Sequence, residues 1–176
     1  MAKSIWGIDP THSEIGFRVK HMMFTNVSGK FKAFQVYFEN TDDQFETSQI
    51  SFSADVNSID TSSADRDNHL RSADFFDVDK FPKITFNSTE LRKINEGQFQ
   101  LTGDLTIKDI TRSIVLDVEY SGLLKDPWGN TRIAASVSGK INRKDFGLGW
   151  NAALEAGGLL VGEDIKLLAE VQLIKE

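Results

Sequence analysis

The feature that most constrains the fold is an alternation of apolar and polar residues that returns in run after run along the 176-residue chain. In the stretch from Ile50 to Val56, for example, Ile, Phe, Ala and Val alternate with Ser, Ser and Asp. A period of two places the apolar side chains on one face of an extended strand. Similar runs cover residues 15–19, 84–86, 99–107, 114–120, 133–141 and 165–173. The pattern predicts an all-β protein.

About eight such strands follow one another, and turn sequences connect several of them. Asn95-Glu96-Gly97 and Asp126-Pro127-Trp128-Gly129-Asn130 have the composition of hairpin turns. Strands joined in this way form an antiparallel meander, and eight of them close readily into a barrel without exposed edges. We expect an antiparallel eight-stranded β-barrel that forms a single domain over residues 1–176. Its interior can be filled by side chains or can hold one small ligand.

Three segments depart from the alternation. Residues 21–26 break it as a loop or a single helical turn would, and their Met and Phe side chains could cap a cavity. Between residues 27 and 38 the apolar phase shifts near Ala33 and Phe34. A one-residue shift indicates a β-bulge, which bends a strand at a barrel corner. Residues 152–156 could form a helical turn.

Residues 62–86 are the one part of the chain that does not read as strand and turn. Ser62, with Asp65 three positions later, is typical of a helix start, and the run that follows lacks Gly and Pro. Pro82 ends any helix and favours an extended conformation before it. We expect one short inserted helix over an end of the barrel, followed by an aromatic plug. The alternative is a crossover helix whose aromatic residues close an ordinary core.

Composition narrows the possible partners. The net charge of −6 argues against nucleic acid, because binding phosphates needs a basic face. No apolar run approaches the ~18 residues of a membrane span. The first residues lack the apolar core of a secretory signal, so a cytoplasmic location is expected. The 13 Phe residues against 2 Tyr indicate that the interior, or something held there, is oily.

The polar residues give little sign of catalysis. Of His12, His21 and His69, only His69 has a potential metal ligand at a helical spacing, Asp65, and one such pair is a weak signal. The simpler interpretation of each histidine is a side chain hydrogen-bonded at a strand or helix end. The chain has no Cys nucleophile and no hydrolase, phosphate-loop or metalloprotease motif. We expect no metal and no cofactor.

Two charged clusters each have a structural and a functional interpretation. The charges at 65–71 can form a solvated helix face with pairs four residues apart. Alternatively, Arg66 reaches the barrel mouth and receives an anionic head group. Arg143 and Asp145 can form a weak surface pair, or a polar anchor at the rim. The sequence leaves both choices open.

Several motifs together resemble the YceI-like family. They are, in chain order, Trp6-x-Ile8-Asp9-x-x-His12-Ser13-x-Ile15-x-Phe17-x-Val19-x-His21-Met22, Val27-x-Gly29-x-Phe31, Asp65-Arg66-Asp67-x-His69-Leu70-x-Ser72-x-Asp74-Phe75-Phe76-Asp77, Phe81-Pro82-x-Ile84-x-Phe86-x-Ser88, Gly103-Asp104-Leu105-Thr106-Ile107-Lys108 and Ile141-x-Arg143-x-Asp145-Phe146-Gly147. Each piece alone is weak, but together they span essentially the whole chain in the right order.

The resemblance implies a lipocalin-like barrel with an elongated apolar lumen that binds, stores or carries a long amphiphilic lipid. The ligand classes it implies are polyisoprenoids, isoprenoid quinones, prenyl phosphates and fatty-acid derivatives. A homodimer is plausible for the family. On this interpretation the head group lies near His12, Arg66, Arg143 or Asp145. The residues expected along the lipid tail are Phe17, Val19, Phe24, Phe31, Phe52, Phe75, Phe76, Phe86, Leu105 and Trp150.

Two other functions stay open at this point. One is an enzyme acting on an isoprenoid-like substrate, with His12 or His69 as the acid or base. The other is a stress-related structural protein whose barrel is filled. A solid barrel and a hollow one have the same alternating pattern, so the sequence does not separate them. A hollow barrel would need few polar contacts, because burying a lipid chain contributes roughly 0.8 kcal/mol per CH₂.

Overall fold

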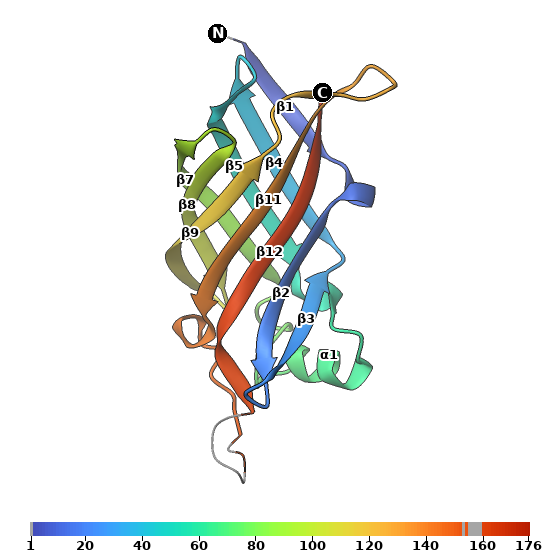
Figure 1. The fold of residues 1–176 in the computed structure, drawn as a ribbon. Helices are drawn as coiled ribbons and strands as arrows, with labels where there is room; N and C mark the ends of the chain where they lie inside the picture. Colours follow the sequence, from blue (N-terminus) through green and yellow to red (C-terminus); the bar gives the residue numbers. More distant parts are fainter. Residues whose placement is uncertain (1, 153, 155–159) are drawn as a thin grey trace.

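The computed structural model describes residues 2–152, 154 and 160–176, most of which lie in antiparallel strands (Figure 1). The strands are β1 (Lys3–Ile8), β2 (Glu14–His21), β3 (Thr25–Phe31), β4 (Phe34–Thr41), β5 (Gln44–Asp55), β6 (Ile59–Asp60), β7 (Lys83–Asn95), β8 (Gln98–Ile107), β9 (Ile110–Tyr120), β10 (Leu124–Lys125), β11 (Thr131–Asn142) and β12 (Val161–Lys175). The helices are the 3-10 helices η1 (Pro10–His12), η2 (Val56–Ser58) and η3 (Arg143–Phe146) and the α-helix α1 (Ala64–Arg71). The helical turn expected at 152–156 falls partly outside the described residues.

Eight of these strands close into a barrel. Their order around it is β11-β9-β8-β7-β5-β4-β1-β12, and β12 pairs with β11 to complete the circle. Each pairing around the circle is antiparallel. The expected eight-stranded antiparallel barrel with one short inserted helix is therefore confirmed. Among the described residues, no helix has both the length and the apolar character needed to cross a membrane.

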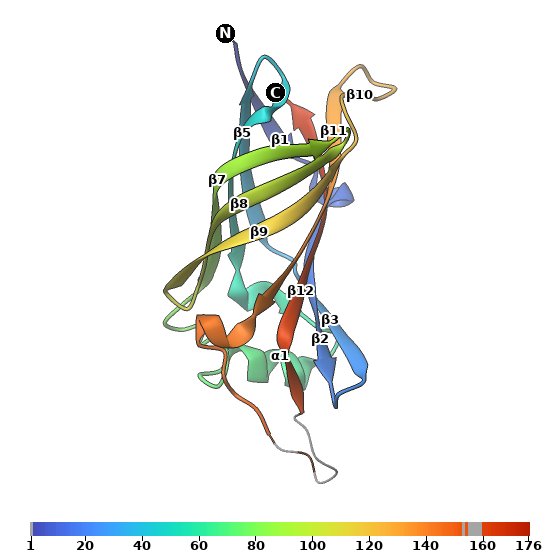
Figure 2. The ribbon, with the colours of Figure 1, turned by 60° about the vertical axis from the view of Figure 1, so that its left-hand side comes forward.

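The hairpin of β2 and β3 extends the barrel wall at one end. β1 pairs with residues 173–175 of β12, and β2 pairs with residues 161–170 of the same strand. β3 and β4 are likewise separated by two residues, Lys32 and Ala33, where the phase shift predicted a bend. The hairpin therefore continues past β1 and β4 toward α1, away from the chain termini (Figures 1 and 2).

The end of the barrel that carries the termini is filled by aromatic side chains. The Phe45 ring stacks on Tyr120, with centroids 4.0 Å apart, and meets Phe99 edge-on at 4.8 Å. Phe38 stacks on the other side of Phe45 and meets Trp6 edge-on. The Trp6 Nε1–H donates to the buried Asn40 side chain at 3.0 Å, which satisfies its one polar atom. This end of the barrel is solid.

Polar contacts hold α1 against the short strand β6. The Ser63 side chain caps the helix by accepting from the Arg66 N–H at 3.3 Å, one residue later than the expected Ser62. The carboxylate of Asp67 is buried and accepts from both the N–H and the hydroxyl of Thr61, at 2.9 and 2.5 Å. Arg71 donates to backbone carbonyls of 57 and 59. The expectation of a solvated helix face is therefore wrong at Asp67, because the neighbouring turn presents donors to it.

Replacing Asp67 with alanine should lower the free energy of unfolding by about 2 kcal/mol, because it leaves a buried N–H of Thr61 without its charged acceptor. Urea denaturation followed by circular dichroism measures this change. Asp65→Ala is the matched control, since Asp65 lies in the same helical turn and is exposed. Equal stability of the two variants would contradict the role given to Asp67.

Candidate ligand-binding cavity

An apolar cavity of about 260 Å³ lies inside the barrel. Its walls are the inward faces of the strands, whose alternation places one residue in two toward the interior. Side chains from β2, β3, β4, β5, β7, β8, β9, β11 and β12 contribute, together with residues of α1 and of the segments that follow α1 and η3. Among the described residues that line it, Arg143 alone carries a charge.

Partial exposure of the inward-facing residues shows that the lumen is hollow. Phe17, Val36, Phe52, Leu167 and Ala169 all line the cavity, yet each is only partly buried. By contrast, Trp6 and the rings that surround it at the other end are almost fully buried. Close packing leaves few voids in ordinary protein cores. The barrel is therefore filled with side chains at the end that carries the termini and hollow beyond that end.

Most of the residues predicted for a lipid tail line this cavity. Those that do are Phe17, Val19, Phe31, Phe52, Phe75, Phe76, Phe86 and Leu105. Trp150 lies just outside the lining and packs against His69 and Phe75, with centroids 4.6 and 5.4 Å away. Phe24 does not face the cavity, because the chain turns at Met22 and Met23 and leaves its side chain 83% exposed.

The segment after α1 covers the hollow end of the barrel. Leu70 of the helix and the consecutive rings of Phe75 and Phe76 line the cavity. Phe76 meets Phe31 of β3 edge-on at 6.4 Å, which connects the covering segment to the β2–β3 hairpin. The predicted helix and aromatic plug over one end of the barrel therefore describe the arrangement better than a crossover helix in an ordinary core.

The Arg143 guanidinium lies at this end, 2% exposed, and is held by four backbone carbonyls. Its Nε donates to Gly162 at 2.7 Å, its Nη1 to Leu148 and to Trp150 (2.9 Å for the latter), and its Nη2 to Val161 at 3.3 Å. No carboxylate among the described residues forms an ion pair with it. Burial lowers the pKa of this guanidinium. A buried cation whose partners are all neutral is well suited to an anionic or strongly dipolar ligand group.

The other residues predicted for a head group lie away from the cavity. Arg66 points back at Thr61, where its Nε donates to the hydroxyl at 2.8 Å. Asp145 is exposed on η3. His12 is exposed in η1 and bonds Asp9. Of the four predicted residues, Arg143 alone lines the lumen. The other three lie at the surface of the protein.

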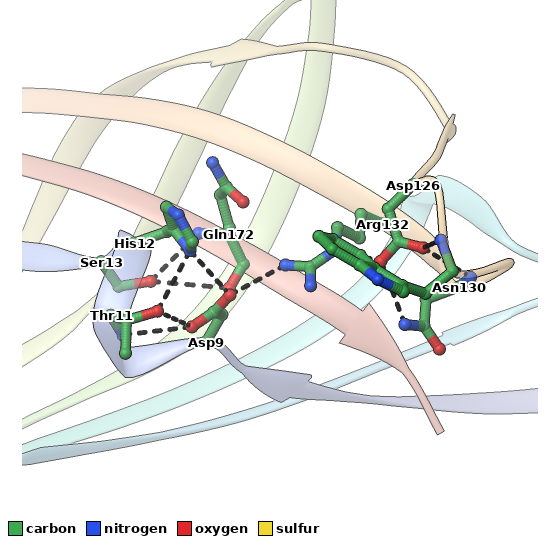
Figure 3. A network of polar contacts seen from close by, with 9 residues as sticks. Asp9, Thr11, His12, Ser13, Asp126, Asn130, Arg132 and Gln172 are labelled. Atoms are coloured by element: carbon green, nitrogen blue, oxygen red, sulfur yellow. Dashed lines mark hydrogen bonds and ion pairs between the residues drawn. The ribbon is translucent and has the colours of Figure 1, made fainter.

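His12 belongs instead to a charged network that joins η1 to the turn after β10 (Figure 3). Arg132 of β11 lies between two carboxylates and donates to Asp126 at 2.7 Å and to Asp9 at 2.8 Å. The Nδ1 of His12 lies 2.9 Å from the same Asp9 carboxylate. Arg132 holds the pKa of both carboxyl groups well below the usual range, and His12 and Thr11 add to the effect at Asp9. The network is structural and is not directed at the cavity.

This network should make folding stability depend on pH in the acid range. A carboxyl group with a lowered folded-state pKa contributes stability above its unfolded pKa of about 4, and that contribution is lost as the pH falls below it. Arg132→Met should therefore unfold at a lower temperature than the wild type at neutral pH, and the gap should narrow progressively as the pH falls below about 4. Differential scanning fluorimetry across this range measures both. Arg112→Met, at an exposed arginine of β9, is the control. A gap that stays constant with pH would contradict the assignment.

Several residues of the cavity were not singled out from the sequence. Val36, Ile50, Leu167 and Val171 lie on the same apolar phases as the predicted phenylalanines and line the lumen as they do. The alternating pattern places these aliphatic residues on the inner face too, but only the larger aromatic residues were chosen as tail contacts. His69 makes a 2.8 Å contact with the Asp74 carboxylate. The described residues contain no cluster of three or more His, Cys, Asp or Glu side chains placed to hold a metal.

Comparisons with known proteins agree with this architecture. The family model described as the YceI-like domain matches residues 6–173. The UPF0312 protein SA2479 of Staphylococcus aureus is 39% identical over 165 residues, which are 93% of this chain and 94% of that one. The UPF0312 protein SERP2314 of Staphylococcus epidermidis is 39% identical over 168 residues, which are 95% of each chain.

Solved structures show the same barrel. The YCEI protein of Campylobacter jejuni superposes with a TM-score of 0.75 at 31% identity, covering 89% of this chain and 90% of that one. A polyisoprenoid binding domain from Saccharophagus degradans superposes with a TM-score of 0.67 at 14% identity, covering 100% and 99%, which is a likeness of fold. With the family model matching nearly the full length and the barrel shared with solved relatives, the chain belongs to the YceI-like family.

Proposed function

We propose that the protein binds a long amphiphilic lipid, with the tail in the lumen and the polar end at Arg143, and stores or carries it. The observation that carries the proposal is a hollow, apolar lumen with the buried Arg143 among the residues around it. The ligand classes that fit are polyisoprenoids, isoprenoid quinones, prenyl phosphates and fatty-acid derivatives. The fold that the chain shares with a polyisoprenoid binding domain supports the first of these.

The size of the cavity favours a slender ligand. At about 260 Å³ the cavity lies just below the usual volumes of small-molecule sites, which begin at roughly 300 Å³. Each methylene that leaves water contributes about 0.8 kcal/mol. Affinity should therefore rise with chain length until the lumen is full, and a bulky fused-ring ligand should bind poorly.

A binding role is favoured over catalysis. Neither His12 nor His69, the histidines considered as acid or base, lines the cavity. The one charged side chain that does, Arg143, is held by carbonyls and has the chemistry to bind an anion rather than to transfer a proton. We infer that the protein leaves its ligand chemically unchanged.

Native mass spectrometry of the purified protein, followed by organic extraction, tests the proposal. We expect a lipid adduct at one per chain, or uptake at that ratio when the delipidated protein is offered geranylgeranyl phosphate, a short-chain ubiquinone or palmitate. A clean apo mass together with no uptake of any of the three would overturn the proposal and leave only the fold.

A further inference from the structure

The tip of the β2–β3 hairpin exposes three consecutive apolar side chains. Met22 is 56% exposed, Met23 64% and Phe24 83%. The tip projects from the barrel at the α1 end, on the side away from the chain termini (Figures 1 and 2). An exposed apolar residue is ordinary when it stands alone. Three consecutive exposed apolar side chains at the tip of a hairpin indicate a surface that binds a partner.

The backbone at the tip adopts a conformation that is unfavourable for methionine. Met22 and Met23 have φ values of +52° and +65°, and the Phe24 N–H donates to the His21 carbonyl at 3.3 Å to close the turn. Two consecutive positive φ values favour Asn and Gly and are costly for long side chains. The turns at 42–43 and 108–109 have the same geometry and use Asp-Asp and Lys-Asp. The apolar side chains, and not the turn geometry, therefore distinguish this tip from the other two turns.

A basic surface extends from the outer face of the same hairpin onto the neighbouring strands β12 and β11. Arg18 of β2 is directly opposite Lys166 of β12, which is directly opposite Lys140 of β11. Like charges in such positions destabilise a sheet. The further exposed cations on the hairpin are Lys20 and Lys30, and we call these five residues the basic face.

The basic face is only partly compensated. Lys140 pairs with Asp164 at 3.4 Å and Lys30 lies directly opposite Asp60 of β6, whereas Arg18, Lys20 and Lys166 have no ion-pair partner among the described residues. The nearby Glu163 is paired with Lys144, which is not part of the face. The chain as a whole carries a net charge of −6, so this concentration of positive charge runs against the average. It provides the charge complementarity that an anionic surface requires.

The inner face of the hairpin forms part of the lumen. Phe17 and Val19 of β2 and Phe31 of β3 line the cavity, in alternation with the basic residues on the outside. Arg143 lies at the same end of the barrel, since it donates to the carbonyls of Val161 and Gly162 and Val161 pairs with His21 of β2. The tip is therefore placed beside the end through which a lipid held with its head at Arg143 would pass.

We propose that this hairpin docks on an anionic lipid membrane. Met22, Met23 and Phe24 enter the boundary between head groups and acyl chains, and the basic face lies against the anionic head groups. A membrane fits these observations better than a protein partner, because the apolar side chains project as a point beside spread cations and form no groove. The inference rests on the proposed function for its purpose, since docking would bring the lumen to a source of lipid.

Flotation with phospholipid vesicles tests the proposal. The wild type should float with phosphatidylcholine vesicles that contain about 30% phosphatidylglycerol, and high salt should weaken the association. The variant Met22→Asn, Met23→Gly, Phe24→Ser suits the turn geometry and should fold normally, but should bind at least about tenfold more weakly. In the double variant Lys20→Gln, Lys166→Gln, the affinity for these vesicles should fall about fivefold for each charge removed.

The matched control is Trp128→Ser, which removes an apolar side chain that is 80% exposed in the turn after β10, at the opposite end of the barrel. It should float like the wild type. Absent flotation, or flotation that the tip variant does not reduce, would overturn the proposal, and so would a concentration-dependent dimer abolished by the tip variant without vesicle binding. Lipid uptake measured by native mass spectrometry stays a separate readout: intact uptake without flotation removes this inference alone, and flotation without uptake removes the proposed function alone.

Discussion

Phe52→Asp should abolish lipid uptake while the barrel remains folded. The Phe52 ring lines the lumen and is only partly buried, because one side of it faces empty space. Its loss removes tail contact worth roughly 2 kcal/mol, and the carboxylate that replaces it would bring water into the lumen. Together these effects should weaken binding at least about a hundredfold. Titration of the delipidated protein with geranylgeranyl phosphate and with palmitate measures the loss.

Ser51→Asp is the control for the added charge. Ser51 precedes Phe52 on β5 and faces outward, where its hydroxyl donates to Asn87 at 3.0 Å. The Ser51 variant should bind like the wild type. Ala169→Trp provides a second test without a charge, because its indole would occupy a large share of the cavity. Wild-type affinity in both lumen variants, with circular dichroism confirming their folds, would exclude the lumen as the tail site.

The barrel could be predicted from the sequence because its signal is local. Alternation along the segment from Ile50 to Val56 determines which side chains share a face, whatever the strand later pairs with. The helix could be predicted for the same reason, to within one residue at its cap. Whether the interior is filled depends on which side chains from different strands meet inside the barrel, and this is not a local property of the sequence. Phe45 and Phe52 lie on the same strand, yet one is stacked between aromatic rings and the other faces the lumen.

The polar part of the site could be predicted less well, because burial of a charge depends on distant backbone. Arg143 and Arg66 both stand in mixed-charge segments, and the sequence pattern predicted a head-group contact for either equally well. The carbonyls that accept hydrogen bonds from Arg143 belong to Leu148, to Trp150 and to the start of β12, up to 19 positions away. Arg66 instead meets Thr61 five positions earlier and stays at the surface. Phe24 differs from the lining phenylalanines through the turn that precedes it.

Arg143→Met should lower the free energy of unfolding by about 3 kcal/mol, because four buried or partly buried carbonyls lose a charged donor. It should also remove discrimination between ligand head groups. The wild type should prefer geranylgeranyl phosphate to geranylgeraniol, which has the same tail without the charge, and the variant should bind the two about equally. This ratio separates head-group recognition from a general loss of stability, since unfolding lowers both affinities together.

Arg143→Lys and Lys144→Met complete the comparison. The lysine keeps the charge but has fewer donors in a less fixed geometry, so it should retain part of the preference for phosphate and lose part of the stability. Lys144 follows Arg143 on η3 but is exposed and paired with Glu163 at 2.7 Å, so its loss should change neither quantity appreciably. A wild type that binds the alcohol as tightly as the phosphate would limit Arg143 to holding the loop of residues 148–150 against β12. The lumen would then recognise its ligand by the tail alone, and affinity would follow chain length rather than head group.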